Sequence, residues 1–308
     1  MTICTPRTDL PFVSLFNRAA FHALNAAPGD AILALPYDEG GRTVGVLSGV
    51  LHEGAFTAGF SSPCSGPDFA RPRETPAHVE AAIDHWLAEL GGLRAERLTF
   101  RCPPASWSPT GALVQFGLLN RGFTVAEADL NHAVDLSRFP TADAYLAALR
   151  SPARRALRHA LGAPFAFAEH QDLTTGYALV HANRRDRGRA LSLSREYFER
   201  VRDALPAAVR CFVLEHEGAP CAAALVMVVA ADRWYVQAWG DAGHRLERSP
   251  MNLLAFRVIE RALAEGVRVL DLGRTTEPGG PPLRVSHGLA QFKQSILATA
   301  ELRPVLVR

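Results

Sequence analysis

Hydrophobic and polar positions in the first half of the chain predict an alternation of strands and helices. Apolar runs and period-two alternation predict strands, whereas apolar residues three and four apart predict helices. The predicted strands are Ala31–Pro36, Thr43–Leu51, Ala55–Phe60, Arg97–Cys102 and Thr124–Leu136, and the predicted helices are Val13–Asn25, the segment that begins at Thr75-Pro76, and Gly111–Asn120. Threonine followed by proline is a typical helix start, because the threonine caps and the proline needs no amide donor there.

The second half repeats this order of elements. Its predicted strands are Phe212–Glu217, Cys221–Val229, Trp234–Gly240, Val267–Leu272 and Leu302–Val307, and its predicted helices begin at Ser249-Pro250 and span His287–Leu297. Each half runs strand, strand, strand, helix, strand, helix, strand, and such a repeat indicates duplicated domains. A basic helix over Thr141–Leu161, with a break at Ser151-Pro152, lies between them. We expect an α/β protein with mixed sheets and two fused domains, residues 1–136 and 137–308.

Composition and charge exclude several classes of protein. Hydrophobic residues make up 48% of the 308 residues, which is enough for a substantial core and argues against disorder. The five cysteines form no CxxC pair, which is typical of reduced thiols in a cytoplasm. The N-terminal residues lack the pattern of a signal peptide, and the most apolar run, Cys221–Ala231, is too short to cross a bilayer. We expect a cytoplasmic protein without a membrane partner.

Five short segments carry a resemblance to a known family. They read YALVHANRRDRG at 177–188, REYF at 195–198, SPMNLL at 249–254, DLG at 271–273 and FK at 292–293. With the order of elements, they resemble the Fem-type branch of the GNAT acyltransferases, whose members carry two GNAT-like domains in one chain. The resemblance implies a degenerate first domain, a catalytic second domain, and transfer of an acyl group to a small-molecule amine.

Two departures from the family bear on the donor. The usual GNAT phosphate loop is absent, since residues 243–250 read GHRLERSP, and the helical-hairpin arm of the peptidoglycan-bridge enzymes is missing. The resemblance leaves acyl-CoA and aminoacyl-tRNA open as donors, the latter with a tRNA acceptor end as partner. The net charge of only +2 and the lack of a long basic face favour acyl-CoA. A non-catalytic binding protein on the same fold is a further alternative.

Three residues are candidates for catalysis. Amine acylation needs an activated acyl group beside the amine, donors for the developing oxyanion, and a proton acceptor. Lys293 is the only lysine among 33 basic Lys and Arg residues and stands at the family's Phe-Lys position, so a compact ammonium is expected to act there. Asp271 ends a predicted strand, where ligand clefts open, and His287 is a possible base. Chance composition and structural pairing are the opposing interpretations.

Donor phosphates are expected at the start of the helix opened by Ser249-Pro250. Free amide groups and the positive end of the helix dipole favour anions there. The predicted phosphate ligands are Arg245, Arg248, Ser249, Asn252 and Arg274. An ordinary capped helix with solvated arginines would have the same sequence.

Aromatic and polar residues are expected to line a substrate groove. The candidates are Trp234, Tyr235, Trp239, Asn183 and Arg184. Burial in the core is the alternative for the aromatic residues, and a solvated helix face is the alternative for the arginine. No HExxH, GxSxG or Cys/His ligand spacing is present, so no metal is expected.

Overall fold

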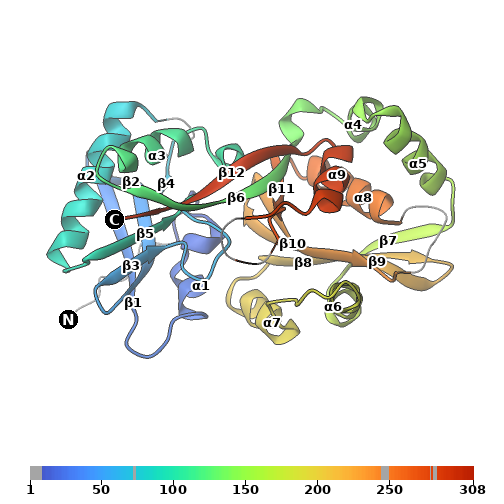
Figure 1. Ribbon diagram of the computed structural model, residues 1–308, viewed down its shortest axis with the longest axis horizontal. Coiled ribbons are helices and arrows are strands. Elements are labelled where there is room, and N and C mark those ends of the chain that lie inside the picture. The colour runs from blue at the N-terminus through green and yellow to red at the C-terminus, as the bar shows by residue number, and fades with distance from the viewer. Residues whose placement is uncertain (1–8, 72–73, 244–249, 278, 280–282) are drawn as a thin grey trace. The chain divides into compact units, whose positions relative to one another are not determined.

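The computed structural model describes residues 9–71, 74–243, 250–277, 279 and 283–308. The chain divides into two compact units (Figure 1). The first comprises Met1–Asn131 together with Glu301–Arg308, and the second comprises His132–Ala300.

The first unit contains a mixed sheet with short helices. Its elements are the 3-10 helices Leu15–Asn17 and Ala105–Trp107, helices α1 (Ala19–Ala23), α2 (Pro76–Gly92) and α3 (Gly111–Leu119), and strands β1 (Ala31–Glu39), β2 (Arg42–His52), β3 (Ala55–Ala58), β4 (Asp68–Phe69), β5 (Arg97–Arg101) and most of β6 (Thr124–Asp135). The strand order includes β1-β2-β3-β5-β12, where β12 is Thr299–Val307. The pair β3–β5 is parallel, and β1–β2, β2–β3 and β5–β12 are antiparallel.

Helix α2 forms where its capping signal predicts it. The Thr75 side chain accepts a hydrogen bond from the amide of His78 at 3.3 Å, and Pro76 occupies the first helical position. The buried face carries Val79, Ala82, Ile83, Trp86 and Leu90. The indole of Trp86 also donates to the carbonyl oxygen of Leu35 in β1, which satisfies its one donor inside the core.

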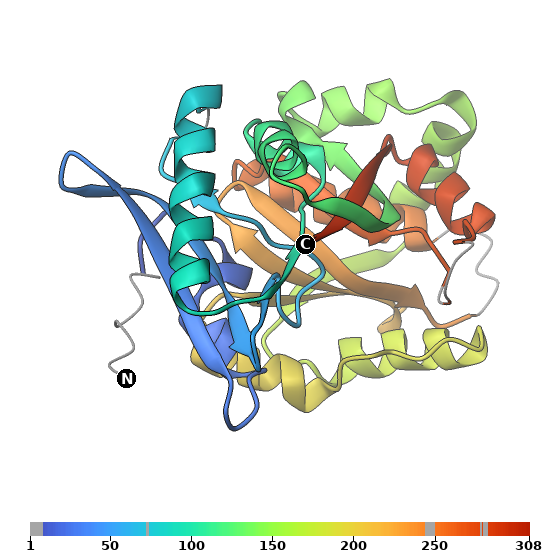
Figure 2. The same ribbon diagram turned by 60° about the vertical axis from the view of Figure 1, so that its left-hand side comes forward.

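The second unit is layered, with helices on both faces of a sheet (Figures 1 and 2). Its elements are a 3-10 turn at Leu136–Arg138, helices α4 (Ala142–Ala148), α5 (Ser151–Leu161), α6 (Thr174–Asp186), α7 (Arg195–Ala204), α8 (Pro250–Ala264) and α9 (His287–Ser295), and strands β7 (Phe165–His170), β8 (Val209–His216), β9 (Ala219–Ala230), β10 (Arg233–Asp241) and β11 (Val269–Arg274). The strand order is β11-β10-β9-β8-β7. Helices α6 and α7 cover one face, and α8 and α9 lie on the other (Figures 1 and 2).

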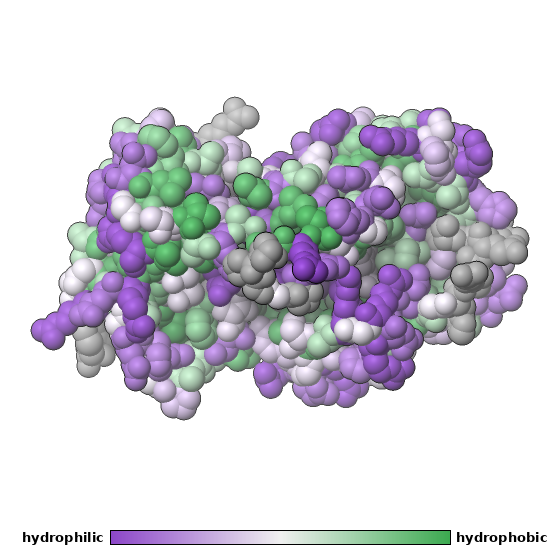
Figure 3. All heavy atoms as spheres, viewed as in Figure 1, coloured by the Kyte–Doolittle hydropathy of each residue, from purple (hydrophilic) through white to green (hydrophobic). Residues whose placement is uncertain are grey.

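Apolar areas interrupt the mostly hydrophilic surface of the first unit in the hydropathy view (Figure 3). Among the described residues, the exposed large apolar side chains are Phe116, Leu119, Val125 and Leu302, all of which belong to this unit. Over the described ranges, no helix has both the length and the hydrophobicity that crossing a bilayer requires.

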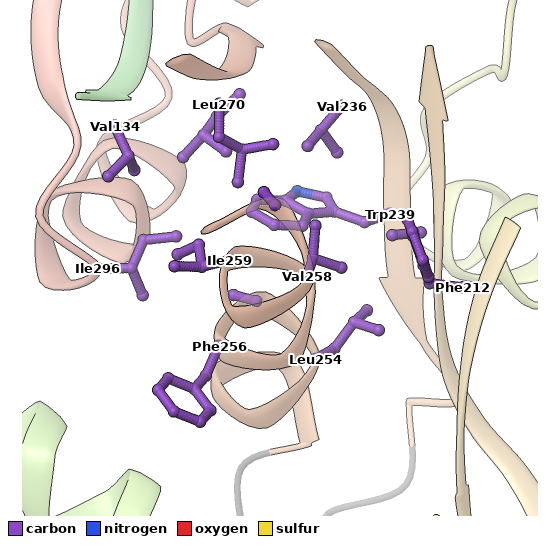
Figure 4. Close-up of a cluster of buried hydrophobic side chains, with 14 of the residues drawn as sticks. Val134, Phe212, Val236, Trp239, Leu254, Phe256, Val258, Ile259, Leu270 and Ile296 are labelled. Carbon is purple, nitrogen blue, oxygen red and sulfur yellow. The ribbon is translucent and has the colours of Figure 1, made fainter. Parts of the chain in front are cut away.

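Helix α8 supplies the centre of the second unit's core (Figure 4). Leu254, Val258 and Ile259 are fully buried, as the helical spacing of apolar residues predicts. A register shift between Val236 and Ala238 in β10 breaks the alternation of side chains, so that Trp239 packs into the same cluster as Val236. The irregularity in β10 therefore decides which side chains of this strand face the core.

The observed elements differ from the predicted ones in three places. The predicted helix Val13–Asn25 is broken into a 3-10 turn and α1, because the Asn17 side chain donates to Gly66 and Asp68 from outside the helix. The loop predicted between β3 and α2 contains the two-residue strand β4. In the second unit, β7, α6 and α7 come before β8, and the predicted element order included none of these three.

The division of the chain also differs from the predicted domains 1–136 and 137–308. The units meet at Asn131 and His132, and the last eight residues belong to the first unit. Val305, Leu306 and Val307 pair with Arg101, Phe100 and Thr99 of β5. Strand β12 lies between β5 and β6, and the apolar pattern of β12 does not specify these neighbours.

Candidate functional site

The site lies where two parallel strands of the second unit separate. Strands β10 and β11 pair only over three residues, from Arg233–Val269 to Tyr235–Asp271. Beyond this point, Gln237 and Ala238 of β10 and Leu272 and Gly273 of β11 line a cavity. Ligands commonly bind where the carboxyl ends of parallel strands open in this way.

Two cavities adjoin at this place. The first, here called the arginine cavity, measures about 710 Å³ and is lined by Arg184, Arg187, Arg189, Arg274, Tyr235, Gln237, Trp239, Gly273, Glu277, Ser286 and Lys293, among others. The second, here called the helix cavity, measures about 470 Å³ and is lined by Asn183, Asp241, Met251, Gly288 and Phe292, among others. Both volumes are typical of small-molecule sites. The two cavities share six lining residues, so one extended ligand could occupy both. The shared residues are Arg184, Arg187, Arg189, Trp239, Ser286 and Leu289.

The end of β11 is held in a fixed turn. Gly273 has φ +72°, a left-handed conformation that favours glycine, and its amide donates to Asp271 Oδ1 at 2.7 Å. A Cβ at position 273 would lie 3.1 Å from the Tyr235 hydroxyl oxygen, so the absent side chain lets the tyrosine approach. Asp271 is 1% exposed and lines neither cavity, so its observed contact shapes the turn.

Lys293 is buried and clamps the residues that follow this turn. Its ammonium, on α9, donates to the carbonyl oxygens of Gly273 at 2.7 Å and Arg274 at 3.0 Å, and to the hydroxyl of Thr275 at 3.1 Å. An ammonium carries three donors, so it can bond to all three of these acceptors at once. Lys293 is only 1% exposed yet lines the arginine cavity, so it forms part of the cavity wall.

A buried histidine continues this hydrogen-bonded chain. The Thr275 hydroxyl lies 2.7 Å from Nδ1 of His132, which is fully buried. Burial, together with the positive charge of Lys293, lowers the pKa of His132 to about 4. A neutral imidazole can accept the Thr275 proton at Nδ1, and the threonine oxygen then accepts from Lys293.

Four guanidinium groups gather around the arginine cavity: those of Arg184, Arg187, Arg189 and Arg274. Burial and the charges of the other three arginines lower the pKa of Arg184. Its Nε atom is buried and has no hydrogen-bond partner among the described residues. Within the described residues, Arg189 is the one member of this group that contacts a carboxylate, that of Glu277 at 3.8 Å, and it also donates to Ser286 at 3.1 Å. The described part of the cavity wall therefore carries an excess of positive charge.

Glu277 is a site residue that the sequence did not single out. A short hairpin after β11 fixes its backbone: the Glu277 amide donates to Arg284, and the Ser286 amide donates to Thr275. An isolated bridge between Thr276 and Val285 lies between these two bonds. The one available signal was the position of Glu277 shortly after a predicted strand end, and its Pro- and Gly-rich neighbours concealed the hairpin.

The predicted groove residues divide between the cavities and the core. Trp239 lines both cavities and packs edge-on against Phe292, and Tyr235 lines the arginine cavity. Trp234 lines neither, since it faces the core cluster and stacks under Arg210 at 4.4 Å. Its position in the predicted strand Trp234–Gly240 could not reveal this face, because the register shift in β10 breaks the alternation.

Asn183 lines the helix cavity, although its amide group is already used. Its Nδ2 donates to the carbonyl oxygen and to the carboxylate of Asp241, each at 2.9 Å. These bonds tie α6 to the end of β10, where Gly240 leaves room for the asparagine. Asn183 therefore shapes the cavity wall as well as lining it.

The remaining predicted residues lie away from the cavities or outside the described chain. His287 is exposed in the first turn of α9, and Asn252 is half-buried in the first turn of α8, and neither lines a cavity. Arg245, Arg248 and Ser249 fall outside the described residues. Within the described ranges, no group of three or more His, Cys, Asp or Glu residues could hold a metal ion.

A family model matches most of this unit. Residues 147–293 match the acetyltransferase (GNAT) domain. Among curated proteins, none matches the chain in sequence.

Solved structures resemble the chain over almost its full length. FemX is similar with a TM-score of 0.72 at 13% identity, covering 96% of this chain and 92% of its own. L-PGS from Bacillus licheniformis is similar with a TM-score of 0.54 at 13% identity, over 91% of this chain and 83% of its own. The C-terminal domain of a putative lysylphosphatidylglycerol synthetase from Agrobacterium fabrum is similar with a TM-score of 0.53 at 12% identity, over 91% and 84%.

Fold and family match together define the class of fold: the chain has the GNAT acyltransferase fold, and its residues 147–293 match the GNAT domain. More particularly, it has the tandem GNAT fold of the Fem-like branch, as the overlap with FemX shows. The predicted fold class and family resemblance are thereby confirmed.

Proposed function

We propose that the chain is an N-acyltransferase that moves an acyl group from acyl-CoA to an amine. The separation of β10 from β11 is the observation that carries this proposal. Backbone groups on separated strands can bind an extended amide chain such as the pantetheine arm. Fixed backbone donors beside the thioester would also stabilise the negative charge that develops on its carbonyl oxygen.

In this proposal the amine nitrogen attacks the thioester carbon directly, without a covalent enzyme intermediate. A C–N bond forms, the C–S bond breaks, and the thiolate leaves. Tyr235 lines the cavity and gives a proton to the thiolate, while Glu277 takes a proton from the amine, and exchange with solvent restores both groups. Lys293 and Asp271 are positioning residues, because they hold the turn at Gly273 that forms part of the cavity wall.

Aminoacyl-tRNA is the second candidate donor, and α5 is the observation that favours it. Arg155 and Arg158 are exposed on this short helix, and Arg154 is half-buried beside them. Such a basic face can contact phosphates of a tRNA acceptor end. The small net charge of +2 and the size of the two cavities favour acyl-CoA.

A salt series with both donors tests the choice. Binding of acetyl-CoA and of a charged tRNA would be measured by titration at several potassium chloride concentrations. We expect acetyl-CoA to bind with a shallow salt dependence. A tRNA complex with a slope equivalent to six or more phosphate contacts, together with no acetyl-CoA binding, would reverse the ranking of the donors. Absence of binding to either would remove the proposed transfer.

A further inference from the structure

The guanidinium groups around the arginine cavity have more charge than the described residues around them neutralise. Arg184, Arg187 and Arg274 have no ion-pair partner among the described residues, and Arg189 meets only Glu277 at 3.8 Å. Side-chain Nε of Arg184 is buried without a hydrogen-bond partner in the described chain. A buried donor without a partner is costly, and like charges held together raise that cost. An anion bound among these groups would accept the missing hydrogen bond and reduce the repulsion between the like charges.

Part of this cluster lies away from the place where the phosphates of CoA are expected. Arg184 belongs to α6, and α6 and α8 lie on opposite faces of the sheet (Figures 1 and 2). Anions of the donor are expected at the N-terminus of α8, where free amides and the helix dipole favour them. Arg184, Arg187 and Arg189 line both cavities, but Arg274 lines the arginine cavity alone, together with Tyr235 and Gly273, where the thioester would lie. The pantetheine arm separates the thioester from the phosphates of CoA, so an anion near the reacting carbon belongs to the other substrate.

We propose that the acceptor is an acidic amine, whose carboxylate or phosphate group binds Arg184, Arg187 and Arg274 while its amino group meets the thioester. This inference rests on the proposed acyl transfer. Arg184 supplies the partly buried donor, and the exposed Arg274 closes the cluster from the end of β11. Planar guanidinium groups bind both kinds of anion with paired hydrogen bonds.

Anion binding is tested first, without turnover. The unfolding midpoint would be measured with inorganic phosphate and with succinate, each in the presence and absence of saturating CoA. We expect at least one anion to raise the midpoint, and we expect the effect to persist with CoA bound. Arg184→Gln combined with Arg274→Gln should weaken apparent binding about tenfold or more. Arg185→Gln is the matched control, because Arg185 is exposed on the same helix, pairs with Asp186 and lines neither cavity.

Turnover then separates the kinds of acceptor. Acetyl transfer would be compared for β-alanine against β-alaninamide, and for phosphoethanolamine against ethanolamine. We expect the acidic member of at least one pair to be preferred about tenfold or more, and the double variant to remove that preference through the KM of the acceptor.

Three results would overturn the inference: no stabilisation by either anion, loss of the anion effect when CoA is bound, or a preference for the neutral amines. In each case transfer to neutral amines would leave the proposed function standing. Anion stabilisation that Arg184→Gln removes, in a protein that does not bind CoA, would instead support the anion site and contradict the proposed donor.

Discussion

The ammonium of Lys293 donates a 2.7 Å hydrogen bond to the carbonyl oxygen of Gly273, the residue at which β11 turns into the cavity wall. This bond connects α9 to the strand end twenty residues earlier. It also explains why a lysine stands here in a chain whose other basic residues are arginine. A compact ammonium can reach two carbonyl oxygens and a hydroxyl at once inside the core.

Replacing Lys293 by arginine should therefore disturb both stability and transfer. The planar guanidinium group is larger and cannot place three donors as the ammonium does, so buried carbonyl oxygens lose their partners. We expect a loss of about 2–4 kcal/mol in unfolding free energy. We also expect a ten- to thousandfold loss in rate, the scale of a misplaced site. Gln291→Arg, at an exposed position of the same helix, is the control. Wild-type stability and kinetics in Lys293→Arg would refute the clamp.

Gly240→Ala should displace Asn183 from the wall of the helix cavity. A Cβ at position 240 would lie 2.7 Å from Cβ and Cγ of Asn183, so the asparagine must move and lose its bonds to Asp241. We expect a loss of about 1–3 kcal/mol, measured by denaturant unfolding, and weaker CoA binding. Gly162→Ala is the control, because its Cβ would meet nothing nearer than 3.6 Å. Equal stability of the two variants would contradict this account.

Arg210→Lys should destabilise the second unit. Arg210 contacts Glu169 through two nitrogens, reaches Glu265 at 2.8 Å, and lies over the ring of Trp234. Lysine keeps the charge but loses the planar fork and the stacking, which should cost about 1–3 kcal/mol. Thermal unfolding of Arg210→Lys beside Arg257→Lys tests this, since Arg257 pairs only with Glu260 on its own helix among the described contacts. A similar small effect in both variants would mean that charge alone matters at position 210.

Stability should fall on acidification because two histidines are buried neutral. Burial lowers the pKa of His22 to about 4, and burial with the charge of Lys293 does the same for His132. The unfolded chain binds protons near pH 6.5, so it binds more protons than the folded chain between about pH 6.5 and 4. Stability is therefore complete above about pH 7 and decreases as pH falls through that window, by roughly 3 kcal/mol for each histidine.

The histidine prediction is checked by unfolding free energies across the pH window. His22→Phe should reduce the slope by about half, because it removes one of the two buried neutral histidines and leaves His132. His159→Gln, at an exposed position, should leave the slope unchanged. A steep wild-type slope that persists in His22→Phe would assign the acid sensitivity to other groups.

The sequence by itself determined the helices whose caps or hydrophobic spacing lie within the helix. The Thr75-Pro76 cap placed the start of α2, and the spacing of Leu254, Val258 and Ile259 predicted the buried face of α8. Period and capping act over one or two helical turns, so they can be read from neighbouring residues. The repeated element order, together with the short family segments, also predicted the tandem fold.

Tertiary structure decided the features that make the site. The cavity exists because β10 and β11 separate after Tyr235, and β12 pairs with β5, a strand about two hundred residues earlier. Similarly, Glu277 enters the site through a hairpin, and His132 stays neutral because of what surrounds it. Strand pairing and pKa depend on burial and on groups distant in sequence, whereas hydrophobic period depends on near neighbours. The chain's own pattern therefore specifies its helices and strands, and their packing specifies the chemistry at the end of β11.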